Sequence, residues 1–126
     1  MKILVVDDSR AMRSLIRRTL RGIRSGAADI TEAENGREAL DAIRASPPDL
    51  VLANFNMPEL SGIELLERLH ADGVDVSFGF ITSDDSTSNV ERARRAGARF
   101  VIAKPFTRQD LRRAVNEATE VTRSSP

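Results

Sequence analysis

The sequence predicts a doubly wound α/β fold, in which a five-stranded parallel sheet is covered by helices on both faces. The first run, residues 3–6, is continuously aliphatic, which is typical of a strand buried on both faces. Similar short runs recur at residues 30–33, 50–53, 76–82 and 100–103. The segments between them have apolar residues at helical spacing. Regular alternation of strand and helix favours parallel strands joined by right-handed crossovers.

Five helices are expected after these strands, at residues 12–23, 36–45, 61–69, 85–96 and 107–118. The first combines an apolar stripe with an arginine-rich polar face, and Pro47 lies just past the end of the second. Ser61 and Glu64 have the spacing of a capping box at the start of the third helix. Thr107 and Asp110 resemble the same start signal at the fifth.

The length of 126 residues fits one domain, which we expect over residues 1–121 with a short tail at 122–126. The absence of cysteine excludes thiol catalysis and thiolate metal sites. The chain has no apolar stretch of the length that a membrane helix needs and no signal-peptide core, so we expect a cytoplasmic protein without membrane contact. Nineteen basic residues balance nineteen acidic ones, which argues against direct nucleic-acid binding.

Polar residues follow the predicted strands at their carboxyl ends, where ligands bind in open parallel sheets. They are Asp7 and Asp8 after the first strand, Asn54 and Asn56 after the third, Thr82 at the end of the fourth and Lys104 after the fifth. Carboxylate and amide oxygens suit a hard cation, and an ammonium with a hydroxyl suits an oxyanion. The sequence therefore predicts a site for both at this edge of the sheet.

Four motifs at these positions resemble those of the receiver domain of two-component response regulators, including the chemotaxis regulators. They are V-V-D-D-S at 5–9, D-L-V-L-A-N-F-N-M-P-E-L-S-G at 49–62, F-I-T-S at 80–83 and A-K-P-F at 103–106. The resemblance covers residues 1–121. It implies a flavodoxin-like sheet with strand order 2-1-3-4-5.

The resemblance also implies a role for each site residue. In receiver domains a histidine kinase or phosphotransfer protein donates a phosphoryl group to an aspartate after the third strand. Mg²⁺ would be held by the Asp7 and Asp8 pair, with Asp8 as the direct ligand, by the residue at position 54, here Asn54, and by the backbone carbonyl of Asn56. Thr82 and Lys104 would contact the phosphoryl group.

The phosphoacceptor position is Asn54, which departs from the family pattern. A neutral amide is a far poorer nucleophile than a carboxylate, so we expect no ordinary aspartyl phosphorylation. Asn54 also leaves two carboxylates for Mg²⁺ instead of three, which predicts weak binding of the cation. Asn54 either is natural, in a pseudo-receiver, or replaces an aspartate altered at this one position. The sequence leaves both possibilities open.

Two further features bear on signalling. The switch position, three residues before Lys104, often holds an aromatic residue in receiver domains, whereas Val101 stands here and its stiff side chain cannot make the same large movement. Arg13, Arg17 and Arg21 on the first helix form either a solvated face or a docking surface for an acidic partner.

The predicted function is that of a single-domain receiver protein that acts through protein contacts and not as an enzyme. Its partners would be a histidine kinase or phosphotransfer protein and a downstream target, and the chain would be a monomer or a weak homodimer. The alternative is a small phosphatase or phosphotransferase with Asp7 or Asp8 as its nucleophile. Enzymes of the haloacid-dehalogenase type, however, separate their two acids by one residue, whereas Asp7 and Asp8 are adjacent.

Overall fold

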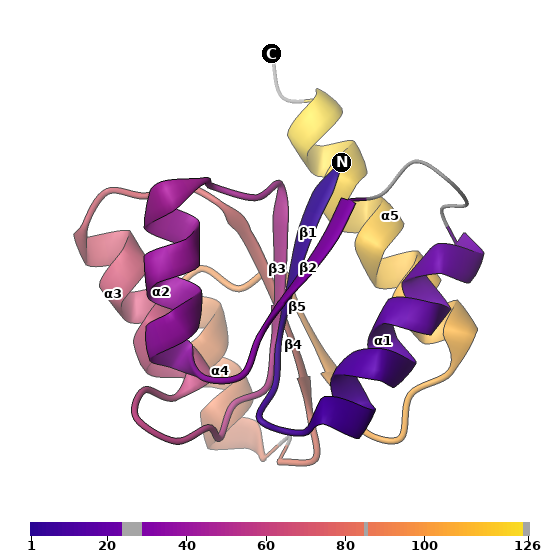
Figure 1. Ribbon diagram of the computed structural model, residues 1–126, viewed down its shortest axis with the longest axis horizontal. Helices are drawn as coiled ribbons and strands as arrows, with labels where there is room; N and C mark the ends of the chain where they lie inside the picture. Colours follow the sequence, from indigo (N-terminus) through magenta and orange to yellow (C-terminus); the bar gives the residue numbers. More distant parts are fainter. Residues whose placement is uncertain (24–28, 85, 125–126) are drawn as a thin grey trace.

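The computed structural model describes residues 1–23, 29–84 and 86–124. Its five strands form one parallel sheet in the order β2-β1-β3-β4-β5, and its five helices alternate with the strands along the chain (Figure 1). The predicted flavodoxin-like doubly wound fold is therefore confirmed.

The strands lie within about one residue of the predicted positions: β1 Lys2–Val6, β2 Asp29–Ala33, β3 Leu50–Ala53, β4 Ser77–Thr82 and β5 Phe100–Ala103. Their register brings the carboxyl ends into line. Val6 pairs with both Ala33 and Ala53, and Thr82 pairs with Ala103. The residues that follow these strands consequently emerge at one edge of the sheet.

The helices are α1 Arg10–Ile23, α2 Gly36–Ala45, α3 Gly62–Ala71, α4 Thr87–Arg95 and α5 Arg108–Ser124. The capping box at α3 is present, because Ser61 and Glu64 each accept a hydrogen bond from the other's backbone N–H. Thr107 and Asp110 form the same reciprocal pair at α5. Both predicted start signals are confirmed.

Two helix ends differ from expectation. The helix α1 begins at Arg10, earlier than predicted, because the Ser9 hydroxyl caps it by accepting from the Met12 N–H at 3.2 Å. The helix α5 continues to Ser124, so residues 122–124 are helical and not a loose tail. Neither glycine nor proline interrupts the sequence there before Pro126. Asp85, predicted to open α4, and residues 125–126 lie outside the described residues.

Two apolar clusters cover the two faces of the sheet. One face packs against α2, α3 and α4, and the other packs against α1 and α5, as the two groups of helices in Figure 1 show. Successive strand residues alternate between the clusters: Leu4 faces the first, whereas Ile3 and Val5 face the second. This alternation explains why the strand sequences are continuously apolar. None of the helices in the described part of the chain is long and apolar enough to cross a bilayer.

Candidate functional site

Backbone hydrogen bonds extend the strand pairing by one residue at the carboxyl edge, and this pairing places the site residues side by side. The Asn54 N–H donates to the carbonyl of Val6 at 3.1 Å. The Lys104 N–H donates to the carbonyl of Thr82 at 2.7 Å. Asp7 follows β1 directly and donates its N–H to Ala33 of β2. The backbones of Asp7, Asn54 and Lys104 are thus each held by a neighbouring strand.

Asp7 and Lys104, 97 positions apart in the chain, form an ion pair with Nζ and Oδ2 separated by 3.1 Å. The Asp7 side chain is 3% exposed and that of Lys104 is 16% exposed. The other carboxylate oxygen of Asp7 accepts the Ser9 N–H at 2.9 Å. A buried carboxylate is stable only when it is paired and hydrogen-bonded, and Asp7 meets both conditions.

The second acid of the predicted pair behaves differently. The Asp8 side chain is exposed, and within residues 1–23, 29–84 and 86–124 it has no hydrogen bond or ion pair. The adjacent carboxylates are therefore one buried, paired group and one solvated group.

Asn54 uses its carboxamide within its own loop. Its Nδ2 group donates to the backbone carbonyl of Asn56 at 3.1 Å. The first residue of α3 contacts this loop, because the Gly62 N–H donates to the carbonyl of Phe55 at 2.8 Å. A Cβ atom at Gly62 would lie 2.0 Å from the Asn54 carbonyl oxygen, so only glycine permits this close approach.

Thr82 is fully buried at the end of β4, and its hydroxyl oxygen accepts the Asp84 N–H at 3.0 Å. The Asp84 carboxylate in turn accepts from Asn89 of α4 at 2.8 Å. Through Asp84, these contacts link the end of β4 to the first turn of α4. Asp84 and Asn89 were not predicted as part of the site, and the one signal in the sequence that could have identified them is the abundance of Asp, Ser and Thr in this segment, since these residues form local side-chain to backbone hydrogen bonds.

The Mg²⁺ that the resemblance implies finds a poor set of ligands here. Both oxygens of Asp7 already accept hydrogen bonds, and the Asn56 carbonyl accepts from Asn54. Of the side chains predicted as Mg²⁺ ligands, only the Asp8 carboxylate has no protein partner in the described part of the chain. Among those same residues, no group of three or more His, Cys, Asp or Glu side chains is placed to hold a metal ion. The arrangement as it stands does not fit a tightly bound Mg²⁺.

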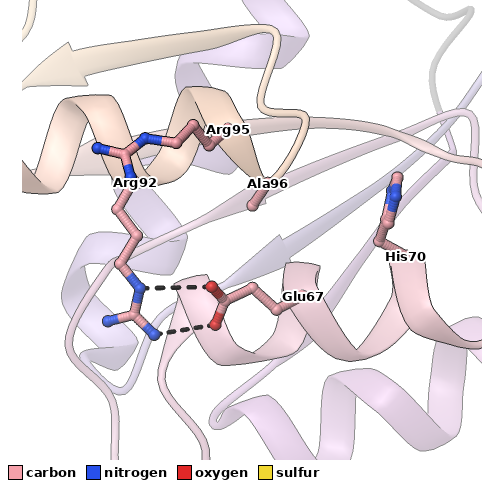
Figure 2. A pocket seen from close by; sticks show the side chains of 5 residues that line it. All are labelled: Glu67, His70, Arg92, Arg95 and Ala96. Carbon is pink, nitrogen blue, oxygen red and sulfur yellow. Dashed lines mark hydrogen bonds and ion pairs between the residues drawn. The ribbon is translucent and has the colours of Figure 1, made fainter.

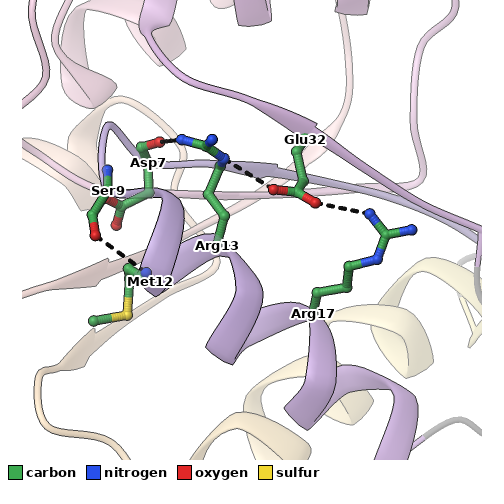
Figure 3. Close-up of polar contacts among 6 residues, drawn as sticks. All are labelled: Asp7, Ser9, Met12, Arg13, Arg17 and Glu32. Carbon is green, nitrogen blue, oxygen red and sulfur yellow. Dashed lines mark hydrogen bonds and ion pairs between the residues drawn. The ribbon is translucent and has the colours of Figure 1, made fainter.

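Two of the three arginines predicted as a partner surface are held within the fold (Figure 3). Arg13 and Arg17 both pair with Glu32 of β2, at 2.9 Å and 2.8 Å. Arg13 also donates to the backbone carbonyl of Asp7 at 2.7 Å. Hydrogen bonds from Arg17 and Arg13 lower the pKa of Glu32 below its usual 4.5. Of the predicted set, only Arg21 is exposed.

Val101, at the switch position, is partly buried and packs against the cluster on the α2, α3 and α4 face. Phe100 packs against the opposite cluster, as strand alternation predicts. The phenyl ring of Phe100 therefore lies on the other side of the sheet from the side chain of Val101.

A hollow of about 310 Å³ lies apart from these residues, between α3 and α4 (Figure 2). Arg92 donates to both carboxylate oxygens of Glu67 across it, at 2.9 Å and 3.4 Å, and His70 and Arg95 line its rim. About half of each paired side chain is exposed, so this ion pair holds two helices together weakly.

Comparison with known proteins gives the same assignment as the site. The family model of the response regulator receiver domain matches residues 3–116. Chemotaxis protein CheY1 of Helicobacter pylori is 40% identical over 115 residues, which cover 89% of this chain and 91% of that protein. The chemotaxis protein CheY homolog of Campylobacter jejuni is 38% identical over 120 residues, covering 93% and 91%.

A solved structure extends the comparison to the fold. The receiver domain of Francisella response regulator 1452 matches with a TM-score of 0.85 and 29% identity, covering 96% of this chain and 98% of that one. Since the strand order, the cluster at the carboxyl edge and these matches agree, the chain belongs to the response regulator receiver domain family, whose members act in two-component signalling.

Proposed function

We propose that this chain is a receiver domain of a chemotaxis-like pathway that signals by protein contacts, without aspartyl phosphorylation. The observation that carries the proposal is Asn54, which stands directly after β3, at the phosphoacceptor position of the family, on the same edge of the sheet as the Asp7–Lys104 pair. A cytoplasmic location and weak Mg²⁺ binding belong to the same proposal.

The chemistry of the amide supports it. Forming an aspartyl phosphate requires a carboxylate oxygen to attack phosphorus while the donor's leaving group departs. The lone pairs of a carboxamide are delocalised and carry no net charge, so attack from Asn54 is strongly disfavoured. Asp7 offers no ready replacement, because both its oxygens accept hydrogen bonds within a buried ion pair.

A direct test uses acetyl phosphate with Mg²⁺ and intact-mass spectrometry on this chain and on Asn54→Asp. Only the aspartate variant should gain a phosphoryl group, and the gain should be lost after hydroxylamine treatment. Stable phosphorylation of the unchanged chain would contradict the proposal. Comparison of the encoding gene with this chain decides whether Asn54 is natural or an alteration at one position.

The proposed partners are a histidine kinase or phosphotransfer protein and a downstream target. The structure redefines which arginines of α1 are available to them, because Arg10, Arg18 and Arg21 are exposed whereas Arg13 and Arg17 are paired with Glu32. Leu15, one turn before Arg18 on the same helix, is 43% exposed, and it is the only large hydrophobic side chain that is exposed among the residues whose burial is described. An exposed apolar side chain beside a cation suits a partner with an apolar patch and an acidic rim.

Charge reversal tests this surface. Arg18→Glu with Arg21→Glu should weaken binding to a kinase or phosphotransfer domain of the same genome by about tenfold or more, chiefly through slower association. Arg112→Glu with Arg113→Glu, at two exposed arginines on α5, is the matched control and should leave binding unchanged. Equal loss in both variants would assign the effect to net charge and remove α1 as the docking surface.

The phosphatase alternative is tested by the same protein. Turnover of a generic phosphoester that depends on a divalent metal and is lost in Asp7→Ala would support it. The engagement of both Asp7 oxygens favours the receiver reading.

A further inference from the structure

The polar cluster at the carboxyl edge is already complete from its own residues. The Asn56 backbone carbonyl accepts the Asn54 Nδ2 group at 3.1 Å, and the Asp7 carboxylate accepts the Lys104 ammonium at 3.1 Å. These two acceptors are the carbonyl and one of the carboxylates that the family resemblance assigns to a divalent cation. Both acceptors receive their hydrogen bonds from N–H groups, one on the Asn54 amide and one on the Lys104 ammonium.

We propose that the Asn54 carboxamide and the Lys104 ammonium together replace the divalent cation in this chain, so that the cluster is held closed without metal. Lys104 supplies the positive charge beside the buried Asp7, and Asn54 supplies the hydrogen bond to the Asn56 carbonyl. This proposal rests on the weak Mg²⁺ binding of the proposed function and names the two groups that cause it.

The role of Asn54 depends on its hydrogen-bond donor and not only on its lack of charge. An aspartate at this position has no proton to give at neutral pH, so the Asn56 carbonyl would lose its partner. The aspartate would also add a third carboxylate close to Asp7 and Asp8, and a cation would relieve both effects. The amide satisfies the carbonyl and avoids the repulsion in one side chain.

The role of Lys104 rests on burial. The Asp7 side chain is 3% exposed and the ammonium is 16% exposed, so solvent and salt screen this pair much less than a surface pair. An ammonium held in this way keeps a divalent cation from the same carboxylate by charge repulsion as well as by occupying an oxygen.

Asn54→Ala distinguishes the effect of the hydrogen-bond donor at position 54 from the effect of its charge. Asn54→Ala has the same net charge as the original chain but frees the Asn56 carbonyl. We expect it to bind Mg²⁺ about fivefold more tightly, the change that corresponds to one neutral hydrogen bond. Asn54→Asp should bind more tightly still, and Lys104→Gln should add to either variant because it frees the Asp7 oxygen. Calorimetric titration with Mg²⁺ and thermal melts with and without Mg²⁺ measure these effects.

The matched control is Ser14→Ala, which removes an exposed, uncharged polar side chain on α1 that takes no part in these contacts. Its Mg²⁺ affinity should equal that of the original chain. In that chain Mg²⁺ should leave the melting temperature unchanged, and in Asn54→Asp it should raise it by several degrees. Equal affinity in Asn54→Ala and the original chain would overturn the role of the donor, and a Mg²⁺-dependent melt in the original chain would overturn the replacement as a whole. Neither result bears on phosphorylation, which the mass measurement tests separately.

Discussion

The Lys104 ammonium lies 3.1 Å from the Asp7 carboxylate and joins the end of β5 to the end of β1 across two intervening strands. Asp7 is almost fully buried, so this contact is the main compensation for its lost hydration. The ion pair therefore connects the stability of the sheet to the composition of the site.

Removal of one partner should show this connection. Lys104→Met leaves the Asp7 charge buried without a cation, and we expect unfolding free energy to fall by about 2–4 kcal/mol, since breaking buried pairs is strongly destabilising. The double change Asp7→Asn with Lys104→Met removes both charges and should recover most of the loss. Urea denaturation measures both proteins. A loss below about 0.5 kcal/mol in the single variant would mean that water already solvates Asp7.

The Glu32 carboxylate accepts hydrogen bonds from Arg13 and Arg17, which lower its pKa below the usual 4.5. A carboxyl group whose pKa is lowered by folding adds stability that is fully present above the unfolded pKa. That contribution is lost as the pH falls through the folded pKa. Glu32→Gln should therefore be less stable than the original chain by about 0.5–1 kcal/mol at pH 7.

The difference should vanish at a pH below the lowered pKa of Glu32, where both proteins are neutral at this position. Thermal melts of the original chain and Glu32→Gln at a series of acidic pH values measure this difference in stability. Glu34→Gln is the control, because Glu34 is exposed and has no ion pair in the described residues. A difference that persisted unchanged into strong acid would assign the effect to packing and not to charge.

Gly62 should tolerate no side chain. A Cβ atom there would lie 2.0 Å from the Asn54 carbonyl oxygen and 2.9 Å from the Phe80 ring, and both are fixed in the core or the sheet. Gly62→Ala should cost about 2–4 kcal/mol, in the range of severe overpacking, and should disturb the loop that carries Asn54. Ala71→Gly at the other end of α3 is the control for helix propensity. Chemical denaturation compares them, and a loss in Gly62→Ala no larger than the control would contradict the close contact.

Much of the fold could be predicted because its causes are local. Continuous aliphatic runs mark strands buried on both faces, and the Ser61–Glu64 and Thr107–Asp110 pairs mark helix starts by their own hydrogen bonds. The end of α5 was missed because no glycine or proline marks it before Pro126. Where neither glycine nor proline follows a helix, its last residue depends on fraying and on packing, and the local sequence gives little indication of either.

The site was predicted as a set of residues but not as a set of contacts. The strand ends bring Asp7 and Lys104 to one edge, yet the choice of Lys104 to pair with Asp7 depends on burial that only the folded chain defines. Arg13, Arg17 and Arg21 of α1 were predicted to share one surface because the sequence does not show which of them is paired inside the fold. Glu32 lies on another strand, and its position opposite Val5 in the sheet brings it within reach of Arg13 and Arg17.

We propose that Asn54 makes the site unresponsive to phosphoryl chemistry, while the residues around it remain able to support that chemistry. Amide NMR spectra with beryllofluoride and Mg²⁺, recorded on this chain and on Asn54→Asp, test it most directly. We predict that the original spectrum is unchanged, whereas the aspartate variant shows shifts at Thr82, Lys104 and the loop after β3. Equal shifts in both proteins, or none in either, would contradict the account.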